Sequence, residues 1–467
     1  MSYKQMSNFA RKNKVVIADV RFTDLWGTWH HISVPISYLN GAVTTGIGYD
    51  GSSIRGYQLI ESSDMVLRVD PNAPYFMDPF TEHPTLAVFA NTYNPNGGDE
   101  YTKDPRVVAQ RTEAYLRKSG LADKAFFGPE AEFFVFDEVE FVKGGNGDPV
   151  LKVYSEEIES DGKNHGHTQV KKGAYFPLMP DKLQDIRTAI VLKLEGVGVD
   201  VEAHHHEVAR AQNEIDMHYQ TLTRMGDFLQ IYKNFVVTEA RKRGKTATFM
   251  EKPLPDDNGS GMHIHQSLWA NGRPLFAGRK YSGLSREALW YIGGLNEHAR
   301  ALAPIISQNV LAYERYRPGF EAPNLARGFS ARNRSAPNRI PVYFDSPKAR
   351  RIEFRPPGPT CNPYLAFSAM ILAGMDGISR HIDPGQPLEK DFYELDERER
   401  EEYGLVTMPA SLEEAVKELE KDHDFLLRSG VWTEELLGTL ISEKKREVEQ
   451  AKKDPMETLR RCYSYGI

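Results

Sequence analysis

Hydrophobic positions near the start of the chain follow a pattern typical of strands. The runs VVIADVRFTD (15–24) and GTWHHISVPI (27–36) are rich in β-branched and aromatic residues. Gly27, which lies between the two runs, can adopt the positive φ that a tight turn needs. We therefore predict two paired strands here and a strand-rich first unit.

A helix is predicted directly after a turn-rich segment. Residues 91–100 (NTYNPNGGDE) collect Asn, Pro and Gly, which favour loops. Asp104 can then cap a helix that begins at Pro105 and ends before Gly120. We place a domain boundary here, which gives an N-terminal domain of residues 1–103 and a second domain of residues 104–467.

Helices and strands are predicted to alternate in the second domain. Each of three further helices has a capping pair or a terminating glycine beside apolar residues at helical spacing. These helices follow Asp181 with Gln184, run over 222–243 before Gly244, and begin at Ser411 with Glu414. Loops are predicted at 144–149 and 155–172, and the acidic run 394–402 is predicted to be a solvated surface.

Length, charge and cysteine content exclude several classes of protein. A chain of 467 residues is long enough for two or three domains. Its net charge of −7 includes no one-signed block, which argues against nucleic acid or a membrane surface as a partner. No apolar run approaches the ~20 residues of a membrane span, and the first residues lack the apolar core of a secretory signal. Because the chain also has only 2 cysteines, we expect a cytoplasmic protein.

Pairs of carboxylates mark the candidate chemistry. Glu130 and Glu132 lie two positions apart in an aromatic, β-favouring run, so both are predicted on one face of one strand, where burial would require a cation. Glu207 and Glu214 are seven positions apart, a spacing compatible with two helical turns or with a strand and a loop. The histidines at 204–206 are not predicted to share a zinc ion, because adjacent residues on a strand point to opposite faces.

A glycine loop and a cluster of arginines supply the complementary charge. Residues 257–261 precede a short predicted strand on which His263 and His265 share a face. Arginines are dense over 315–355, and the planar guanidinium pairs with phosphate and carboxylate oxygens. Oxygen-rich ligand sets favour magnesium or manganese over zinc. The residues therefore predict a metal-assisted phosphoryl transferase and leave its acceptor open.

Ordered motifs along the whole chain resemble those of one family. They are YDGSSI (49–54), ESSDM (61–65), GPEAEFF (128–134), KGAYFP (172–177), VEAHHHEVA (201–209), QNEID (212–216), GKTATFM (244–250), NGSGMHIHQSL (258–268), FEAPN (320–324), SARNRS (330–335) and RRIEFR (350–355). The chain closely resembles a type I bacterial glutamine synthetase. The resemblance implies an α+β fold with an N-terminal β-grasp domain and a catalytic domain, and a dodecamer of two hexameric rings with active sites at subunit interfaces.

The resemblance also implies an activity and a set of site residues. The activity is ATP-dependent ligation of ammonia to the γ-carboxylate of L-glutamate through γ-glutamyl phosphate, giving L-glutamine, ADP and phosphate. Two Mg²⁺ or Mn²⁺ ions are implied, one held by Glu132, Glu207 and Glu214 and the other by Glu130, His263 and Glu353. The implied ATP contacts are Glu202, His265, Ser267, Arg334, Arg339 and Lys348, and the implied glutamate contacts are Asn258, Gly259, Arg315, Glu321 and Arg355.

Three of the implied residues have catalytic roles. Asp50, donated across a subunit interface, would deprotonate ammonium. Glu321 would close over the reactive intermediate, and Arg334 would stabilise the transferring phosphoryl group. The segment DFYEL (391–395) resembles a loop that is adenylylated in related enzymes, which makes Tyr393 a candidate substrate of an adenylyltransferase.

The sequence departs from the family pattern beside the glutamate contacts, and two alternative functions remain. Phe320, Asn324 and the Pro356–Pro357 pair are the departures, and they are expected to retune affinity. One alternative is a γ-glutamylpolyamine synthetase-like ligase, which would accept a bulkier amine; Asp50 and Glu321, which form an ammonium-sized acidic pocket, argue against it. The other alternative is a non-catalytic structural relative. All six implied metal ligands are present in this sequence, which argues against it.

Overall fold

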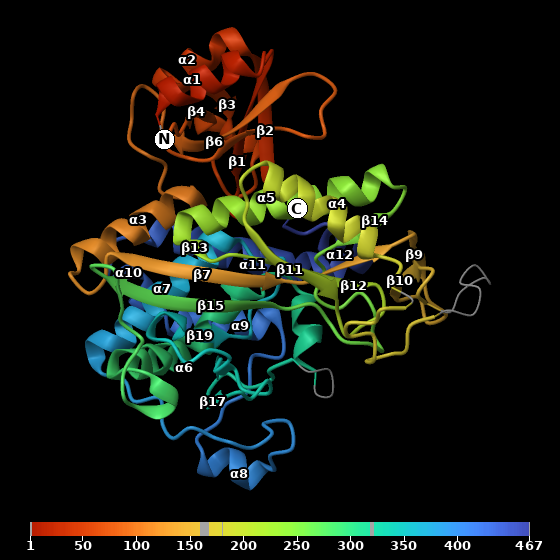
Figure 1. The fold of residues 1–467 in the computed structure, drawn as a ribbon, viewed down its shortest axis with the longest axis vertical. Helices are drawn as coiled ribbons and strands as arrows, with labels where there is room; N and C mark the ends of the chain where they lie inside the picture. Colours follow the sequence, from red (N-terminus) through yellow and green to blue (C-terminus); the bar gives the residue numbers. More distant parts are fainter. Residues whose placement is uncertain (1, 159–167, 180, 318–321, 467) are drawn as a thin grey trace.

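The computed structural model describes residues 2–158, 168–179, 181–317 and 322–466. A small N-terminal part lies at one end of the molecule, above a larger part that contains the remaining sheets and most of the helices (Figure 1). Among the described residues, none of the helices combines the length and the apolar composition needed to cross a membrane.

A six-stranded sheet forms the N-terminal part. Its strands are β1 (Ile17–Thr23), β2 (Trp29–Pro35), β3 (Ile47–Asp50), β4 (Asp64–Val69), β5 (Tyr75–Met77) and β6 (Thr85–Tyr93). Their order is β2-β1-β6-β4-β3, with β5 beside β6. The predicted strand pair is confirmed, because β1 and β2 are antiparallel and Gly27 has a φ of 82° in the turn between them. Helices α1 (Tyr3–Lys12), which the sequence pattern did not predict, and α2 (Leu39–Thr44) complete this part.

In the described residues of the larger part, the strands form three further sheets. A seven-stranded sheet contains β7 (Lys124–Ala131), β13 (Gln220–Thr221), β15 (Met262–Ala270), β16 (Arg273–Pro274), β17 (Phe329–Ala331), β18 (Asn338–Ile340) and β19 (Ile352–Phe354). A four-stranded sheet contains β8 (Phe133–Phe136), β11 (Val201–His206), β12 (Gln212–Met217) and β14 (Thr246–Thr248), and a hairpin contains β9 (Glu138–Lys143) and β10 (Pro149–Tyr154). The long antiparallel strands β7 and β15 cross the centre of this part side by side (Figure 1).

Helices surround these sheets. They are α3 (Pro105–Lys118), α4 (Gln184–Gly196), α5 (Leu222–Lys242), α6 (Arg286–Ile306), α7 (Pro363–Arg380), α8 (Glu397–Glu402), α9 (Leu412–Lys421), α10 (Asp424–Leu427), α11 (Glu434–Lys453) and α12 (Pro455–Tyr463). The caps predicted for α3 and α9 are confirmed, since Asp104 accepts the backbone N–H groups of Arg106 and Val107 and Ser411 accepts that of Glu414. The acidic run 394–402 is confirmed as surface for its charged residues, since α8 buries no residue, although Leu395 within the run is buried.

The capping box predicted for α4 is wrong. The helix forms where the apolar spacing predicts it, but its N-cap is Leu183, which makes no side-chain cap. Asp181 instead accepts a hydrogen bond from Nη2 of the buried Arg187 at 2.5 Å. A buried guanidinium needs a carboxylate more than a solvated helix end needs a cap, because water can satisfy the latter.

Polar contacts and a shared core join the N-terminal part to the rest. The side-chain amide of Asn362, which caps α7, donates to the carbonyl oxygen of Asp24 at 2.9 Å, and Gln308 donates to that of Trp26 at 2.7 Å. Trp26 itself is buried among apolar residues of both parts. These contacts fix the turn between β1 and β2 against the start of α7 and the segment that follows α6.

Candidate functional site

One large cavity, of about 1210 Å³, lies beside the ends of β7 and β12. Many of the residues predicted to form a site line this cavity. They are Glu130, Glu132, Glu207, Glu214, Asn258, Gly259, His263, Arg315, Arg334, Arg355 and Tyr393. The fold therefore brings together residues that are spread over more than 260 positions of the chain.

Glu130 and Glu132 face the same imidazole, although they are not in one strand. The expectation of a single strand is wrong, because β7 ends at Ala131 and pairs in the seven-stranded sheet while β8 begins at Phe133 and pairs in the four-stranded sheet. Glu132 lies at the break, and its backbone N–H donates to Gly261. Nδ1 of His263 is nevertheless 3.2 Å from a carboxylate oxygen of Glu130 and 3.8 Å from one of Glu132.

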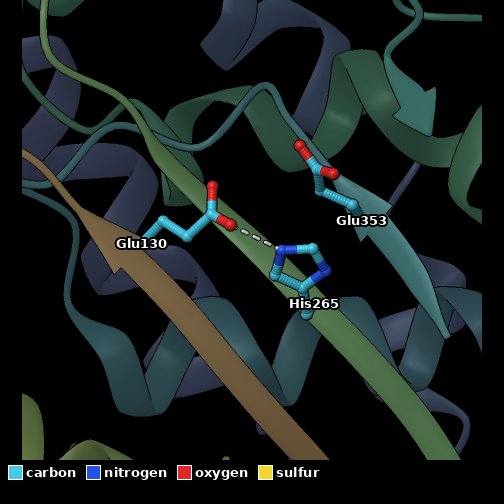
Figure 2. Close-up of side chains that lie close together, drawn as sticks. All are labelled: Glu130, His265 and Glu353. Atoms are coloured by element: carbon cyan, nitrogen blue, oxygen red, sulfur yellow. Dashed lines mark hydrogen bonds and ion pairs between the residues drawn. The ribbon is translucent and has the colours of Figure 1, made fainter. Parts of the chain in front are cut away.

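A compact group of possible metal ligands forms where β7, β15 and β19 run side by side. Glu130, His265 and Glu353 each offer a ligand atom, and these atoms all lie within 4.8 Å of one another (Figure 2). Nε2 of His265 is 2.7 Å from a Glu130 oxygen. Glu353 is fully buried and accepts hydrogen bonds from Arg339 and Arg355. The compact group thus contains His265, which the resemblance assigns to ATP, and His263 contacts the same Glu130 from the next position on that face of β15.

A second acidic group lies on the β11–β12 hairpin. Glu207 follows β11 and Glu214 is in β12, so the strand-and-loop alternative for their spacing is correct. His205, Glu214 and Asp216 also offer ligand atoms within 4.8 Å of one another. The three adjacent histidines have separate partners, as expected: His204 contacts Arg187, His205 faces this acidic group, and His206 contacts Glu157.

The pKa values of three cavity carboxylates, Glu132, Glu207 and Glu214, show that these groups lack sufficient compensating charge. Burial and, after it, the charge of Asp216 raise the pKa of Glu214 well above its ordinary value, and burial raises the pKa of Glu207 to about 7. Burial and the neighbouring Glu207 raise the pKa of Glu132 in the same way. A buried set of carboxylates with raised pKa values is the donor set that a hard divalent cation would neutralise. The residues present therefore fit magnesium or manganese.

The burial of Glu207 predicts that the stability of the metal-free protein depends on pH. Because the pKa of Glu207 is raised from 4.5 to about 7, the folded state binds more protons than the unfolded state over that range. Its contribution to stability is therefore present below about pH 4.5 and is lost as the pH rises through about 7. We expect wild type to lose stability relative to Glu207→Gln by a few kcal/mol across this window.

The measurement is urea unfolding of wild type and Glu207→Gln in EDTA between pH 4.5 and 8. Comparison with the variant cancels the opposite contributions of groups such as Glu353, whose pKa falls to about 2 because Arg355 and His265 outweigh the effect of burial. Saturating Mg²⁺ is expected to abolish the pH-dependent difference. A difference that stays constant with pH in EDTA would contradict the electrostatic account.

Arginines form the opposite side of the site. Nη1 and Nη2 of Arg315 donate to the carbonyl oxygens of Pro356 and Arg355 at 2.9 and 3.2 Å, which holds the guanidinium against the segment that follows β19. A Cβ at Gly261 would overlap Nη2 of Arg315, which explains why this position is glycine. Arg334 and Arg339 both donate to the hydroxyl of Tyr343, at 3.2 and 2.8 Å. These guanidinium groups supply positive charge for anionic substrates.

Other predicted residues are not among the described residues that line the cavity. Asp50 is exposed on the N-terminal part, where its carboxylate accepts hydrogen bonds from the hydroxyl groups of Ser52 and Ser53. Glu202 pairs with His218 at 2.7 Å, Ser267 accepts from Trp269, and Lys348 is exposed. Glu321 lies outside the described residues.

Tyr393 lies in the wall of the cavity, and its hydroxyl oxygen is buried. The segment around it is attached to the loop that carries Arg334, because Asn333 donates to the carbonyl oxygen of Lys390 at 2.6 Å and the N–H of Phe392 donates to Ser335 at 2.9 Å. An adenylyltransferase could reach this hydroxyl only if the segment moved, and modification of Tyr393 stays a prediction.

Sequence reasoning missed several residues of the cavity. Asp216 and His205 lie beside Glu214, and the aromatic rings of Tyr175 and Phe176 stack on each other 4.0 Å apart at the rim. The i, i+2 spacing of Glu214 and Asp216 on one strand could have indicated Asp216. Nothing in the local pattern indicates His205 or the stacked rings.

In this cavity, carboxylates and imidazoles lie opposite arginines. This arrangement is typical of enzymes that transfer a phosphoryl group with the help of a divalent cation. Two family descriptions match this chain: "Glutamine synthetase, beta-Grasp domain" over residues 14–95 and "Glutamine synthetase, catalytic domain" over residues 102–463. The chain therefore belongs to the glutamine synthetase family. The predicted order, a β-grasp domain and then a catalytic α+β domain, is confirmed.

Individual proteins are similar over almost the whole chain. A glutamine synthetase of Aquifex aeolicus is 46% identical over 455 residues, which cover 96% of this chain and 95% of that protein. A protein of Cupriavidus pinatubonensis named 3-hydroxylaminophenol mutase is 46% identical over 456 residues, which cover 96% of each. The structure of Plasmodium falciparum glutamine synthetase superposes with a TM-score of 0.86 at 28% identity and covers 97% of both chains.

Proposed function

We propose that the chain ligates ammonia to the γ-carboxylate of L-glutamate at the expense of ATP, giving L-glutamine, ADP and phosphate. One observation carries the proposal: buried, mutually repelling carboxylates such as Glu214 line the same cavity as Arg315, Arg334 and Arg355. Such a cavity suits a substrate pair in which one phosphate chain needs cations and one amino acid needs guanidinium groups.

Two divalent cations complete the proposed site. Glu132, Glu207 and Glu214 would hold one, and Glu130, His263 and Glu353 the other. The contact of His265 with Glu130, at 2.7 Å, supports a place for His265 at the edge of the second ion. When bound, these cations would withdraw charge from the phosphate oxygens of ATP.

The chain's own residues would orient the substrates and protect the reaction. Arg315 and Arg355, with the loop at Asn258 and Gly259, would hold the glutamate carboxylates. Glu202, His265, Ser267, Arg339 and Lys348 would bind ATP, and Arg334 would balance the charge that develops on the γ-phosphoryl group as it moves. Glu321 would shield the intermediate from water.

Two bond exchanges complete the proposed reaction. A γ-carboxylate oxygen of glutamate forms a bond to the γ-phosphorus as the bond to ADP breaks, which gives γ-glutamyl phosphate. Asp50 from a neighbouring subunit would take one proton from ammonium. The ammonia would then attack the γ-carbonyl carbon and expel phosphate, and the nitrogen would lose its second proton to the departing phosphate. The exposed position of Asp50 on the N-terminal part supports its use across an interface, in a dodecamer of two hexameric rings. A cytoplasmic location and control by an adenylyltransferase belong to the same proposal.

The acceptor amine is tested by ADP release. Purified enzyme, ATP, Mg²⁺ and glutamate are combined with ammonium, with putrescine, or with no amine. We expect fast release and stoichiometric glutamine with ammonium alone. Release that is faster with putrescine would favour the γ-glutamylpolyamine alternative, and no release under any condition would favour a non-catalytic relative.

A further inference from the structure

Glu157 is a completely buried carboxylate for which the reaction above has no use. One of its oxygens, Oε2, is 2.8 Å from Nε2 of His206 and 2.8 Å from the backbone nitrogen of Ala211. Within the described part of the chain, the other oxygen, Oε1, is buried and has no hydrogen-bond partner. A buried carboxylate is costly unless a cation and hydrogen bonds satisfy it, so its presence here requires a reason.

His206 connects this carboxylate to a predicted metal ligand. Its other ring nitrogen, Nδ1, lies 2.7 Å from the carbonyl oxygen of Glu207. Both ring nitrogens therefore lie within hydrogen-bond distance of an oxygen atom. His206 is 1% exposed, so Glu157 and His206 form a buried hydrogen-bonded pair that also contacts the backbone of Glu207.

Ala211 is the second residue through which Glu157 contacts the turn between β11 and β12, and its backbone is strained. Its φ is 63°, in the left-handed region that side chains other than glycine rarely occupy. The hydrogen bond from its N–H group to Glu157 holds the chain in this conformation. The turn between β11 and β12 is thus fixed at both ends by one carboxylate.

Gln212, the residue after Ala211, connects the turn to Glu132, another predicted metal ligand. The side-chain amide of Gln212 donates to Oε2 of Glu132 at 2.7 Å, while its oxygen accepts the N–H of Ala209 at 3.0 Å. Glu214 follows two positions later in β12. The conformation of one turn therefore sets the relative positions of Glu207, Glu214 and Glu132.

We propose that Glu157 and His206 are positioning residues that hold the 206–212 turn in the conformation in which Glu132, Glu207 and Glu214 converge on one divalent cation. This inference rests on the proposed function, because it assumes that these three carboxylates bind a metal. Neither Glu157 nor His206 is expected to contact substrate or the ion.

The test measures Mn²⁺ binding to the full-length, metal-free protein by the electron paramagnetic resonance signal of free Mn²⁺, without substrates. Wild type should show two classes of site. In Glu157→Gln and Glu157→Ala, one class should weaken about 10- to 100-fold while the other stays unchanged. His298→Gln is the matched control, because His298 is also a buried imidazole held by carboxylates, at 3.0 Å from Asp376, and it does not line the cavity. Its Mn²⁺ affinities should equal those of wild type.

A rescue separates positioning from general loss of structure. Because glycine adopts a positive φ without strain, Ala211→Gly in the Glu157→Ala background should recover about 3-fold or more of the lost Mn²⁺ affinity. Thermal unfolding in EDTA reports whether each variant is folded. Two intact site classes in folded Glu157→Ala, or no rescue by Ala211→Gly, would overturn the positioning role while leaving the proposed function standing. Absence of Mn²⁺ binding in wild type would overturn both.

Discussion

Replacing Glu214 by glutamine is expected to abolish turnover while making the metal-free protein more stable. The side chain lies in the most crowded part of the acidic group, where burial and the charges of Asp216 and Glu130 raise its pKa well above the ordinary value. Without a cation, a neutral amide avoids this repulsion, so the free energy of unfolding in EDTA at pH 7 should rise by about 1 kcal/mol or more.

The same substitution removes a ligand that the reaction needs. We expect kcat for ADP release to fall at least about 10²-fold, as when other main stabilisers of transition-state charge are removed. Glu140→Gln serves as the control and should change neither quantity, because Glu140 is a partly exposed carboxylate of β9 that contacts only Lys152 and Tyr154 through its side chain among the described residues. Normal turnover of Glu214→Gln at saturating Mg²⁺, or a loss of stability in EDTA, would contradict the assignment.

Arg334→Ala is expected to produce the second large loss of activity. Its guanidinium lines the cavity and donates to the Tyr343 hydroxyl, a neutral partner that an anionic phosphoryl group can replace. Because the charge on the equatorial oxygens is redistributed only during transfer, kcat should fall about 10²- to 10³-fold while KM for ATP changes little.

Arg327→Ala is the control for this variant. Arg327 is a partly exposed arginine of the same segment that pairs with Glu297 and lies outside the lining of the large cavity. Its kcat and KM should be those of wild type. If Arg334→Ala instead raises KM for ATP and leaves kcat intact, Arg334 binds the ground state and has no special role in transfer.

The sequence correctly predicted those helix ends that are set by a capping residue, a proline or a glycine. Asp104 and Pro105 mark the start of α3, and Gly244, with a φ of 71°, marks the end of α5. The strand predicted through Glu130 and Glu132 failed for a reason that is not local. Glu132 is where the chain passes from one sheet to another, and that change depends on strands such as β12 and β15 that are distant in sequence.

The sequence predicted many of the residues that line the cavity, but it did not predict which of their side chains contact one another. Motif resemblance selected Glu130, His263 and Glu353, yet the compact group contains His265, because Nε2 of that ring reaches Glu130 across neighbouring strands. Which of two imidazoles on one face of β15 comes closer depends on side-chain rotamers. Similarly, the buried hydroxyl of Tyr393 follows from the attachment of its segment to Asn333 and Ser335, which no motif records.

Transfer of labelled oxygen tests the central claim, that the γ-carboxylate of glutamate is activated by ATP before ammonia arrives. Glutamate labelled with ¹⁸O in both γ-carboxylate oxygens is incubated with enzyme, ATP, Mg²⁺ and ammonium, and the released phosphate is analysed by mass spectrometry. If γ-glutamyl phosphate forms, each phosphate carries one ¹⁸O atom and each glutamine retains the other. Unlabelled phosphate released together with labelled glutamine would contradict the account.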